Sequence, residues 1–219
     1  MKSGMRLLIV GGGYIGLEAA ATARKFGVDV TLVEIEERIL KRVAAKETSD
    51  YIRSLHISNG VNIKEAIGLG KFEIVGEKVV SASLTDGSDV SVDFVIVGIG
   101  ITPNTELAEG ANLKINNGIL INDKCQTSVS NIYAAGDCTS FTYKNILVRL
   151  ESVGNAIDQA TVAAQNIMKK HTNYIPKPWF WSDQYDLKLQ IAGLNTGYDD
   201  VVVRKGDSKQ VSHWYYKGQ

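Results

Sequence analysis

The chain has 219 residues, with 24 basic and 24 acidic side chains, so its formal net charge at pH 7 is zero. This balance argues against electrostatic binding of nucleic acid, and no apolar run approaches the roughly 20 residues that a membrane span requires. We expect an ordinary globular protein with one large or two small hydrophobic cores.

The first hundred residues alternate between strand and helix signals. A buried parallel strand is predicted at Leu7–Val10, followed by an alanine-rich helix over Ile15–Phe26 that ends at Gly27. The remaining predicted elements are a strand at Val28–Glu34, a helix at Ala45–Ser58, a strand at Val61–Lys64, and meander strands at Lys71–Val75, Lys78–Leu84 and Asp89–Val97. A β-α-β-α-β series followed by a meander predicts the α/β class and one Rossmann-like, three-layer mononucleotide unit.

The pattern changes from Gly98 onward. A loop is predicted for "GIGITPN", because Pro103 excludes helix at the preceding residue. Short strands are predicted in "GILIND" and "NIYAAGD", and a helix over Ala156–Lys170. The apolar stripe of that helix consists of Ile157, Ala160, Ala164, Ile167 and Met168. From Trp179 come the strand-like runs "LKLQIAGL", "DDVVVRK" and "QVSHWYY", which would make a poor independent fold unless something covers them.

A glycine motif, Gly11-x-Gly13-x-x-Gly16, follows the first strand and opens the first helix. The glycines permit a tight turn and let the backbone approach a pyrophosphate. Tyr14 and Ile15 lie where the helix begins, and free N–H groups there attract phosphate. Glu34 ends the second strand, where an acid can accept hydrogen bonds from both ribose hydroxyls of a dinucleotide. The alternative is a glycine-rich turn that binds no ligand.

Glu34 also indicates which dinucleotide binds. A 2′-phosphate beside this carboxylate would be repelled by about 4 kcal/mol at ~4 Å and an effective dielectric near 20, which favours NAD over NADP. Arg38 and Arg42 soften this prediction, because either could neutralise a phosphate. We therefore predict an NAD site in which Arg38 is a further contact.

Glu18 is expected on the first turn of the first helix. Two interpretations stay open. The helix dipole by itself favours an acid there, or the side chain lies at the nicotinamide end of the dinucleotide site.

The two cysteines, Cys125 and Cys138, are far apart in the sequence and form no C-x-x-C motif. They predict neither a disulfide framework nor a zinc site. We expect two small buried hydrophobic side chains in a reducing cytoplasm.

Six segments occur in a telling order: "LLIVGGGYIGLEAAATARKFGVDVTLVE", "VIVGIGITPNTELAE", "NGILIN", "TSVSNIYAAGDC", "RLESVGNAIDQA" and "PWFWSDQYDLKLQIAGL". Together they resemble the FAD-dependent NADH:ferredoxin reductases within the pyridine nucleotide-disulfide oxidoreductases, the group that includes putidaredoxin, rubredoxin and aromatic-dioxygenase reductases. The resemblance implies an inserted NAD domain over residues 5–93, the returning portion of a split FAD domain over 94–172, and a partial α+β C-terminal domain over 173–219.

The resemblance also implies roles for matched residues. Asp137 would hold the ribityl chain of FAD, and Glu151, Ser152 and Val153 would meet the flavin pyrimidine oxygen at a helix start. Trp181 would form an aromatic wall against flavin and nicotinamide. Gly98 and Gly100 would line the nicotinamide half of the NAD site, with Glu18 near the carboxamide. Two alternatives stay open, in which "GDC" is a plain turn and Trp179, Phe180 and Trp181 are plain core.

The family places a second glycine turn, for the FAD pyrophosphate, upstream of the NAD domain, and the sequence before Met5 contains none. We therefore expect these 219 residues to bind FAD weakly or not at all unless a second copy or another polypeptide completes the site. The implied function is hydride transfer from NADH to FAD and electron transfer to a ferredoxin-type iron–sulfur protein. The alternatives are a non-catalytic NAD-binding module, or an NADH oxidoreductase with another acceptor.

Overall fold

The computed structural model describes residues 1–207 and 210–218. The chain forms two compact units. Unit 1 comprises residues 1–100, 182–189 and 195–219, and unit 2 comprises residues 101–181 and 190–194. The domain boundaries expected at 93/94 and 172/173 are not tested by this division into compact units and stay predictions.

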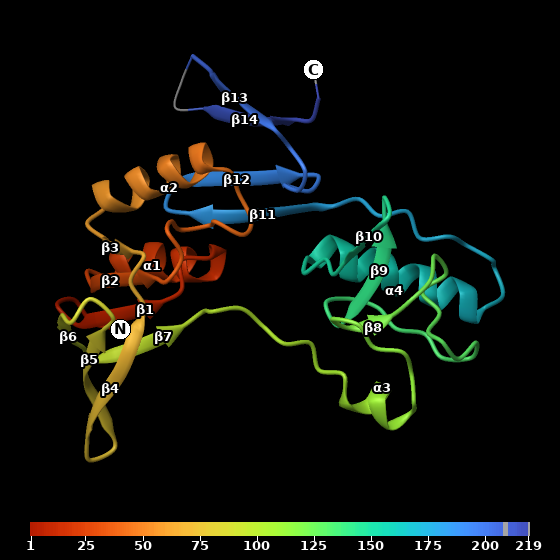
Figure 1. Ribbon diagram of the computed structural model, residues 1–219, viewed down its shortest axis with the longest axis horizontal. Helices are drawn as coiled ribbons and strands as arrows, with labels where there is room; N and C mark the ends of the chain where they lie inside the picture. Colours follow the sequence, from red (N-terminus) through yellow and green to blue (C-terminus); the bar gives the residue numbers. More distant parts are fainter. Residues whose placement is uncertain (208–209, 219) are drawn as a thin grey trace. The chain divides into compact units, whose positions relative to one another are not determined.

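A four-stranded parallel sheet forms the centre of unit 1 (Figure 1). It is built in chain order from β1 (Arg6–Val10), α1 (Tyr14–Lys25), β2 (Asp29–Glu34), α2 (Lys46–Ser58), β3 (Asn62–Glu65) and, after a long interval, β7 (Phe94–Val97). The strand order is β3-β2-β1-β7, so the chain moves outward from β1 and then returns to its other side. This order confirms the Rossmann-like α/β prediction.

The strand predicted at Asp89–Val97 is wrong as a single element. It divides into β6 (Asp89–Ser91), which pairs antiparallel with β5, and β7, which pairs parallel with β1. The antiparallel sheet contains β4 (Leu69–Val75), β5 (Lys78–Leu84) and β6 in that order. A meander pattern and a parallel edge strand look alike in sequence, because both are short apolar runs.

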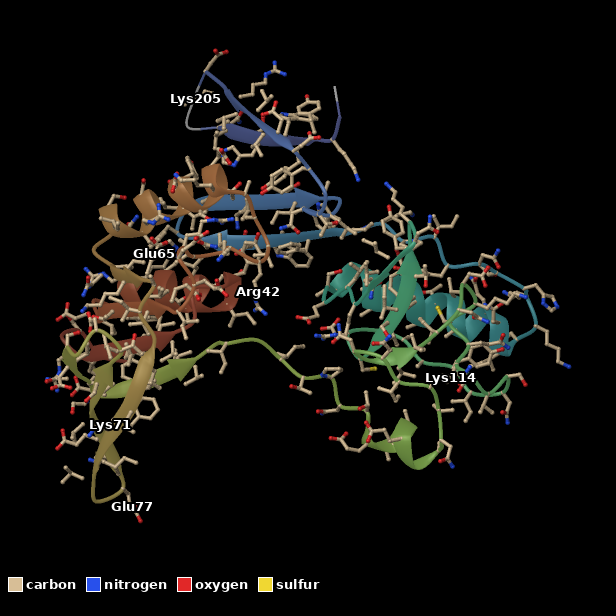
Figure 2. All side chains as sticks on the ribbon, in the orientation of Figure 1. Arg42, Glu65, Lys71, Glu77, Lys114 and Lys205 are labelled. Carbon is tan, nitrogen blue, oxygen red and sulfur yellow. The ribbon has the colours of Figure 1, made fainter. Side chains whose placement is uncertain are left out.

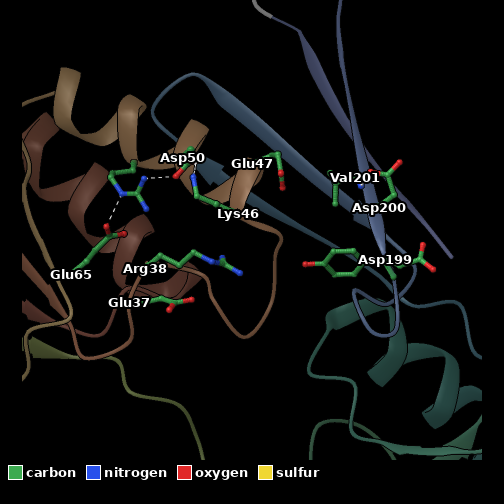
Figure 3. Close-up of a pocket in the computed structure, with 11 residues that line it drawn as sticks. Glu37, Arg38, Lys46, Glu47, Asp50, Glu65, Asp199, Asp200 and Val201 are labelled. Carbon is green, nitrogen blue, oxygen red and sulfur yellow. Dashed lines mark hydrogen bonds and ion pairs between the residues drawn. The ribbon is translucent and has the colours of Figure 1, made fainter. Parts of the chain in front are cut away.

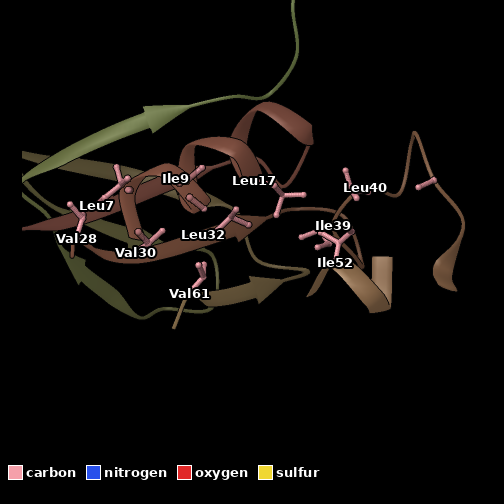
Figure 4. Packing of buried hydrophobic residues seen from close by; sticks show 13 residues of the cluster. Leu7, Ile9, Leu17, Val28, Val30, Leu32, Ile39, Leu40, Ile52 and Val61 are labelled. Atoms are coloured by element: carbon pink, nitrogen blue, oxygen red, sulfur yellow. The ribbon is translucent and has the colours of Figure 1, made fainter. Parts of the chain in front are cut away.

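Both faces of β1 are buried, as is typical of a parallel sheet covered on two sides. Leu7 and Ile9 belong to a cluster with residues of α1 and α2, shown in Figure 4. Leu8 and Val10 pack in a second cluster with residues of β5 and with Val92. The parallel sheet therefore lies between a helical layer and the antiparallel sheet, which is the expected three-layer arrangement.

The C-terminal strands form two hairpins, β11 (Trp179–Gln184) with β12 (Leu187–Ala192), and β13 (Asp200–Lys205) with β14 (Val211–Tyr216). Side chains of β14 hydrogen-bond to the start of α2. The Tyr215 hydroxyl accepts from the Ala45 N–H at 2.9 Å, and Thr48 Oγ1 lies 2.6 Å from His213 Nδ1. The hairpin of β13 and β14 is thus attached to α2 within unit 1 rather than standing alone.

Unit 2 contains α3 (Glu106–Gly110), β8 (Ile119–Leu120), β9 (Thr139–Tyr143), β10 (Ile146–Val148) and α4 (Val153–Ile167). Its three-stranded sheet has the order β10-β9-β8. The strand predicted in "NIYAAGD" is wrong, because that segment makes only an isolated bridge between Tyr133 and Gln126, and the strand follows it as β9. The hydrophobic core of unit 2 consists of Ile121, Cys125, Phe141, Val162, Ala163 and Tyr174.

Helix α4 begins three residues earlier than expected, and its expected apolar stripe lies at the surface. Ile157 is 60% exposed, and Ile167 and Met168 are similarly exposed. The buried positions of α4 are Asn155, Gln159, Val162, Ala163 and Asn166. Hydrophobic periodicity therefore located this helix but did not identify its inner face.

Charged side chains of both signs project from the surface (Figure 2). Exposed Lys71 and Glu77 lie on the β4–β5 hairpin, and exposed Lys205 ends β13. Among the described residues, no helix is long and apolar enough to cross a membrane. These observations agree with the balanced charge of the sequence.

Candidate functional site

The predicted glycine turn connects β1 to α1, and two of its glycines are required by steric contacts. Gly11 has φ +109°, and a Cβ there would lie 2.4 Å from the Gly98 carbonyl oxygen. A Cβ on Gly16 would lie 2.1 Å from the Gly11 carbonyl oxygen. Gly13 has no neighbouring atom within 4 Å of such a Cβ, so its open side leaves room for a ligand.

The turn lies at the topological switch point of the parallel sheet. β1 is flanked by β2 and β7, and the carboxyl ends of β1 and β7 meet where Gly98 N–H donates to the Val10 carbonyl at 2.8 Å. Open α/β sheets bind ligands outside the strand ends at such a point. Gly100 follows with φ +108°. The structure thus brings Gly11, Gly16 and Gly98 into contact, with Gly13 on the same turn. Gly100 follows Gly98 by two residues, and a Cβ there would lie 3.5 Å from Arg42 Nη2.

Glu34 ends β2 as predicted, and its carboxylate is held by two backbone amides. Oε2 accepts from the Gly12 N–H at 2.7 Å, and Oε1 accepts from the Glu36 N–H at 2.9 Å. A Cβ on Gly12 would lie 2.6 Å from Ile39 Cγ2 and 3.1 Å from Glu34 Oε2. Gly12 therefore contacts Glu34 directly. The G-x-G-x-x-G pattern leaves this position unspecified, although the sequence has three glycines in a row here.

The start of α1 has the geometry of an anion site. Gly13 is the N-cap with extended backbone, and no side chain makes a capping hydrogen bond there. Ile15 is exposed, and burial raises the pKa of the Tyr14 hydroxyl. The first turn of a 12-residue helix therefore presents N–H groups and the positive end of the dipole beside Gly13.

The Arg38 guanidinium group forms hydrogen bonds within the protein. Its Nη1 donates to Ser49 Oγ at 2.5 Å, and Nη2 lies 3.5 Å from the Lys41 carbonyl oxygen. Arg38 also lines a cleft of about 900 Å³ in unit 1 (Figure 3). The other residues lining the cleft are Glu37, Lys46, Glu47, Asp50, Arg53, Glu65, Tyr198, Asp199, Asp200 and Val201.

This cleft is acidic. Six of its lining residues are carboxylates and three are bases. Lys46 and Arg53 both pair with Asp50 at 2.5 Å, and Arg53 pairs with Glu65 at 2.8 Å. None of the motif glycines lines the cleft, so it lies beside Arg38 and is distinct from the glycine turn.

Glu18 does not lie on the first turn of α1, so that expectation is wrong. The helix begins at Tyr14, and its first turn contains no acidic residue. The dipole interpretation consequently loses its basis, because the effect fades beyond the first turn. Instead, Glu18 Oε1 accepts a hydrogen bond from Ser182 Oγ at 2.5 Å, a partner that no motif indicated.

A second cluster of predicted residues lies in unit 2. Arg149 Nη1 pairs with Glu151 Oε1 at 2.6 Å and lies 3.5 Å from the Asp137 carbonyl oxygen. Ser152 is the N-cap of α4 and accepts from the Asn155 N–H at 3.4 Å. Val153 is the first, exposed residue of α4. No role was predicted for Arg149, although it is the first residue of the segment "RLESVGNAIDQA" and lies two residues before Glu151.

The turn before Asp137 is tied to the middle of α4. Gln159 is fully buried, and its Oε1 accepts from the Gly136 N–H and from Thr139 Oγ1, each at 2.8 Å. Gly136 has φ +89°, and a Cβ there would lie 3.5 Å from Ala156 Cβ. "GDC" is thus a turn anchored against the helix that carries Ser152 and Val153.

Two polar atoms of this cluster are buried without a hydrogen-bond partner among the described residues, namely Arg149 Nε and Gln159 Nε2. Buried donors normally find an acceptor. Arg149 in particular lies between Asp137 and Glu151, so an acceptor group of a ligand at this turn would satisfy it.

Trp181 is 44% exposed and contacts Trp179, with ring centroids 5.3 Å apart and planes inclined by 32°. The plain-core interpretation of these two tryptophans is therefore wrong. Along β11 the exposed positions alternate with buried ones, so Ser182 and Gln184 are buried beside exposed neighbours.

Both cysteines are free thiols. Cys125 is buried as expected, and burial raises the pKa of its thiol to about 11. Cys138 is only partly buried, which corrects the expectation of two buried side chains. No group of three potential metal ligands occurs within the part of the chain that the structure describes.

Comparison with known proteins gives two family matches. Residues 2–165 match the family described as pyridine nucleotide-disulphide oxidoreductase, and residues 179–219 match the reductase C-terminal family. The chain is 43% identical over 203 residues to a ferredoxin–NAD(P)(+) reductase of a Sphingomonas species, covering 91% of this chain and 49% of the relative. It is 44% identical over 203 residues to putidaredoxin reductase of Pseudomonas putida, covering 91% and 48%.

The solved structures that resemble this chain include reductases of the same kind. The reductase in a covalent putidaredoxin reductase–putidaredoxin complex superposes with a TM-score of 0.93 at 42% identity, covering 99% of this chain and 53% of that one. A ferredoxin reductase from Rhodopseudomonas palustris gives 0.92 at 38% identity, covering 97% and 54%. The chain thus spans about half the length of these relatives.

Proposed function

Because the chain belongs to the pyridine nucleotide-disulphide oxidoreductase family, we propose that it supplies the NADH site of a flavoprotein oxidoreductase. This enzyme passes hydride from NADH to FAD and then electrons to a ferredoxin-type iron–sulfur protein. The observation that carries the proposal is the glycine turn at the switch point, with the Glu34 carboxylate fixed by the Gly12 amide at 2.7 Å.

The dinucleotide is proposed to lie across the carboxyl ends of β1, β2 and β7. Its pyrophosphate would lie over the start of α1, close to the open side of Gly13. The adenosine ribose would donate hydroxyl hydrogens to Glu34. The nicotinamide would extend past Gly98 and Gly100, with Glu18 near its carboxamide.

We infer a preference for NADH over NADPH. Glu34 would repel a 2′-phosphate, and Arg38 is already hydrogen-bonded to Ser49. The neighbouring cleft has six carboxylates against three bases, and two of those bases are ion-paired. The region therefore offers little net positive charge to a third phosphate group.

Reductases of this family bind FAD, and the second cluster fits such a group because Arg149 Nε is buried there without a partner among the described residues. Asp137 and the start of α4 at Ser152 and Val153 would hold the ribityl chain and the flavin ring. Bound FAD would accept the hydride of NADH and release electrons one at a time. Trp181 offers an exposed aromatic face for stacking.

The partner is proposed to be a ferredoxin-type iron–sulfur protein, since the compared reductases are named for ferredoxin or putidaredoxin. One solved relative is a covalent complex of such a reductase with putidaredoxin. A cytoplasmic location is proposed on the two free thiols, because reducing compartments keep cysteines unpaired.

Isothermal titration of the folded chain with NADH, NADPH and ADP-ribose tests the dinucleotide site. We expect NADH and ADP-ribose to bind and NADPH to bind at least about tenfold more weakly. No heat with either NADH or ADP-ribose would overturn the proposal. Adding FAD, NADH and ferricyanide to the same chain then distinguishes an oxidoreductase from a binding module, which would bind without turnover.

A further inference from the structure

We propose that Ser182 is a positioning residue for the nicotinamide end of the dinucleotide site. In this proposal Ser182 holds Glu18 through a buried chain of hydrogen bonds that also includes Gln184, His56 and Tyr185. The proposal rests on the proposed function, because it takes Glu18 to meet the nicotinamide carboxamide. All five residues belong to unit 1.

The chain of contacts is continuous. Ser182 Oγ lies 2.5 Å from Glu18 Oε1, and Gln184 Nε2 lies 3.0 Å from Ser182 Oγ. His56 Nε2 lies 2.8 Å from Gln184 Oε1, and the Tyr185 hydroxyl lies 3.2 Å from His56 Nδ1. It therefore connects three elements, because Glu18 lies on α1, His56 on α2, and Ser182 and Gln184 on β11.

The inner residues of this hydrogen-bond chain are almost inaccessible to solvent. Ser182 is 1% exposed, and Gln184 and His56 are 0% exposed. Glu18, at its end, is only partly buried. Four side chains thus lead from the protein interior to one carboxylate at the surface of the proposed site.

The terminal carboxylate fixes the direction of every hydrogen bond. An ionised Glu18 only accepts, so the single hydroxyl proton of Ser182 must point to it. Ser182 must then accept from the Gln184 amide nitrogen, which turns the amide oxygen toward His56 and makes His56 Nε2 a donor. His56 Nδ1 is left to accept from Tyr185. All donors therefore point toward Glu18, and reversing the Gln184 amide would set two acceptors against one proton.

This arrangement positions a charge rather than moving a proton. The amide of Gln184 interrupts any proton path between His56 and Ser182. Burial lowers the pKa of His56, which favours the neutral imidazole, and the neighbouring Gln184 amide oxygen and Tyr185 hydroxyl then select the tautomer. Hydrogen bonds to charged groups are stronger than those between neutral groups. The hydrogen-bond chain therefore holds Glu18 in one rotamer before the ligand binds.

Preorganisation of Glu18 should matter only for the nicotinamide half of the ligand. A free glutamate must lose rotamer freedom when it binds, and a held one has already lost it. The adenosine half depends on Glu34 and the turn at Gly13, which the chain of hydrogen bonds does not touch. NADH and ADP-ribose, which lacks nicotinamide, therefore separate this role from a general loosening of the fold.

The test compares Ser182→Ala with Ser182→Thr by titration calorimetry against NADH and ADP-ribose. We expect S182A to weaken NADH about tenfold and to leave ADP-ribose within about twofold, which is the size of one hydrogen bond to a charged group. S182T keeps the hydroxyl and should bind NADH nearly as the unchanged chain does. If S182A is too unstable to bind ADP-ribose, Ser182→Cys replaces it, with a smaller expected loss for NADH.

A double-mutant cycle with Glu18→Ala gives the second readout. If Ser182 acts through Glu18, adding S182A to E18A should cause no further loss of NADH affinity. Equal weakening of both ligands by S182A, no weakening, or additive effects in the cycle would each overturn the proposal. An unchanged chain that binds neither ligand would instead overturn the dinucleotide site itself, so the two failures are distinguishable.

Discussion

Each unit places a glycine turn against a helix, and the two turns are built differently. In unit 1 close backbone approach defines the turn, since a Cβ on Gly16 would lie 2.1 Å from the Gly11 carbonyl oxygen, and the Glu34 carboxylate also holds the turn at the Gly12 N–H. In unit 2 the turn is held by a side chain, since Gln159 accepts from the Gly136 N–H and Thr139 Oγ1 at 2.8 Å. Backbone packing leaves a glycine spacing in the sequence, whereas a buried amide leaves almost no pattern.

The helices differ in the same way. α1 buries mainly alanine, glycine and leucine against the parallel sheet. α4 buries Asn155, Gln159 and Asn166 together with two small apolar residues, and exposes Val153, Ile157 and Ile167. A polar inner face makes unit 2 depend on the geometry of individual hydrogen bonds.

The largest effect is expected from Gly16→Ala. Its Cβ would overlap the Gly11 carbonyl, so the turn must shift, with a stability cost of about 1–3 kcal/mol and a loss of NADH binding beyond about a hundredfold. Thermal unfolding and NADH titration measure both. Gly13→Ala is the matched control, because its Cβ meets no protein atom within 4 Å. It should weaken binding and leave the melting temperature unchanged, and equal stability loss in both variants would contradict the steric argument.

Glu34→Gln should come next. The variant removes the charge that repels a 2′-phosphate, so the preference for NADH over NADPH should fall at least about tenfold. The glutamine can accept from only one of the Gly12 and Glu36 N–H groups, so the affinity for both dinucleotides should also fall. Titration with both dinucleotides gives the ratio. Glu36→Gln, on the same loop, serves as control and should leave the ratio within about twofold. An unchanged ratio in E34Q would show that selectivity arises elsewhere.

A smaller effect is expected from Gln159→Leu in unit 2. The Gly136 N–H would lose its buried acceptor, which costs about 1–3 kcal/mol, whereas the Thr139 hydroxyl can still donate to the Gly136 carbonyl oxygen at 2.8 Å. Denaturant unfolding should show the loss. Thr161→Val removes an exposed hydroxyl from the same helix and should change stability by no more than about 0.5 kcal/mol. If Q159L were as stable as the unchanged chain, unit 2 would not depend on this amide.

The smallest effect is the response to acid. Burial lowers the pKa of His56 and His213 below the ordinary 6.5, and both lie in unit 1. As pH falls below 6.5 the unfolded chain therefore binds more protons than the folded one. Unit 1 keeps its full stability above that pH and loses some as pH falls through the folded pKa values.

Denaturant melts between pH 7.5 and 5 would measure this loss. His56→Gln should flatten the pH dependence, whereas His171→Gln, at an exposed position, should leave the slope unchanged. A slope that H56Q does not alter would contradict the assignment to His56.

The glycine turn of unit 1 and its surroundings could be predicted from the residues alone. The strand–glycine–helix spacing and Glu34 follow from rules of backbone geometry, and the structure places Gly11, Gly16, Gly98 and Glu34 around one turn. The segments near "GDC" and "RLES" were predicted through a family resemblance, which carried more information than hydrophobic periodicity.

The contacts between distant segments could not be predicted from local sequence patterns. The tertiary structure placed Ser182 against Glu18, made β7 a parallel strand, and turned the polar face of α4 inward. Local sequence sets backbone conformation and apolar periodicity, whereas the partner of a buried polar group depends on how elements far apart in the sequence pack together. In this protein, Glu18 on α1 is hydrogen-bonded to Ser182, which lies 164 residues later in the sequence.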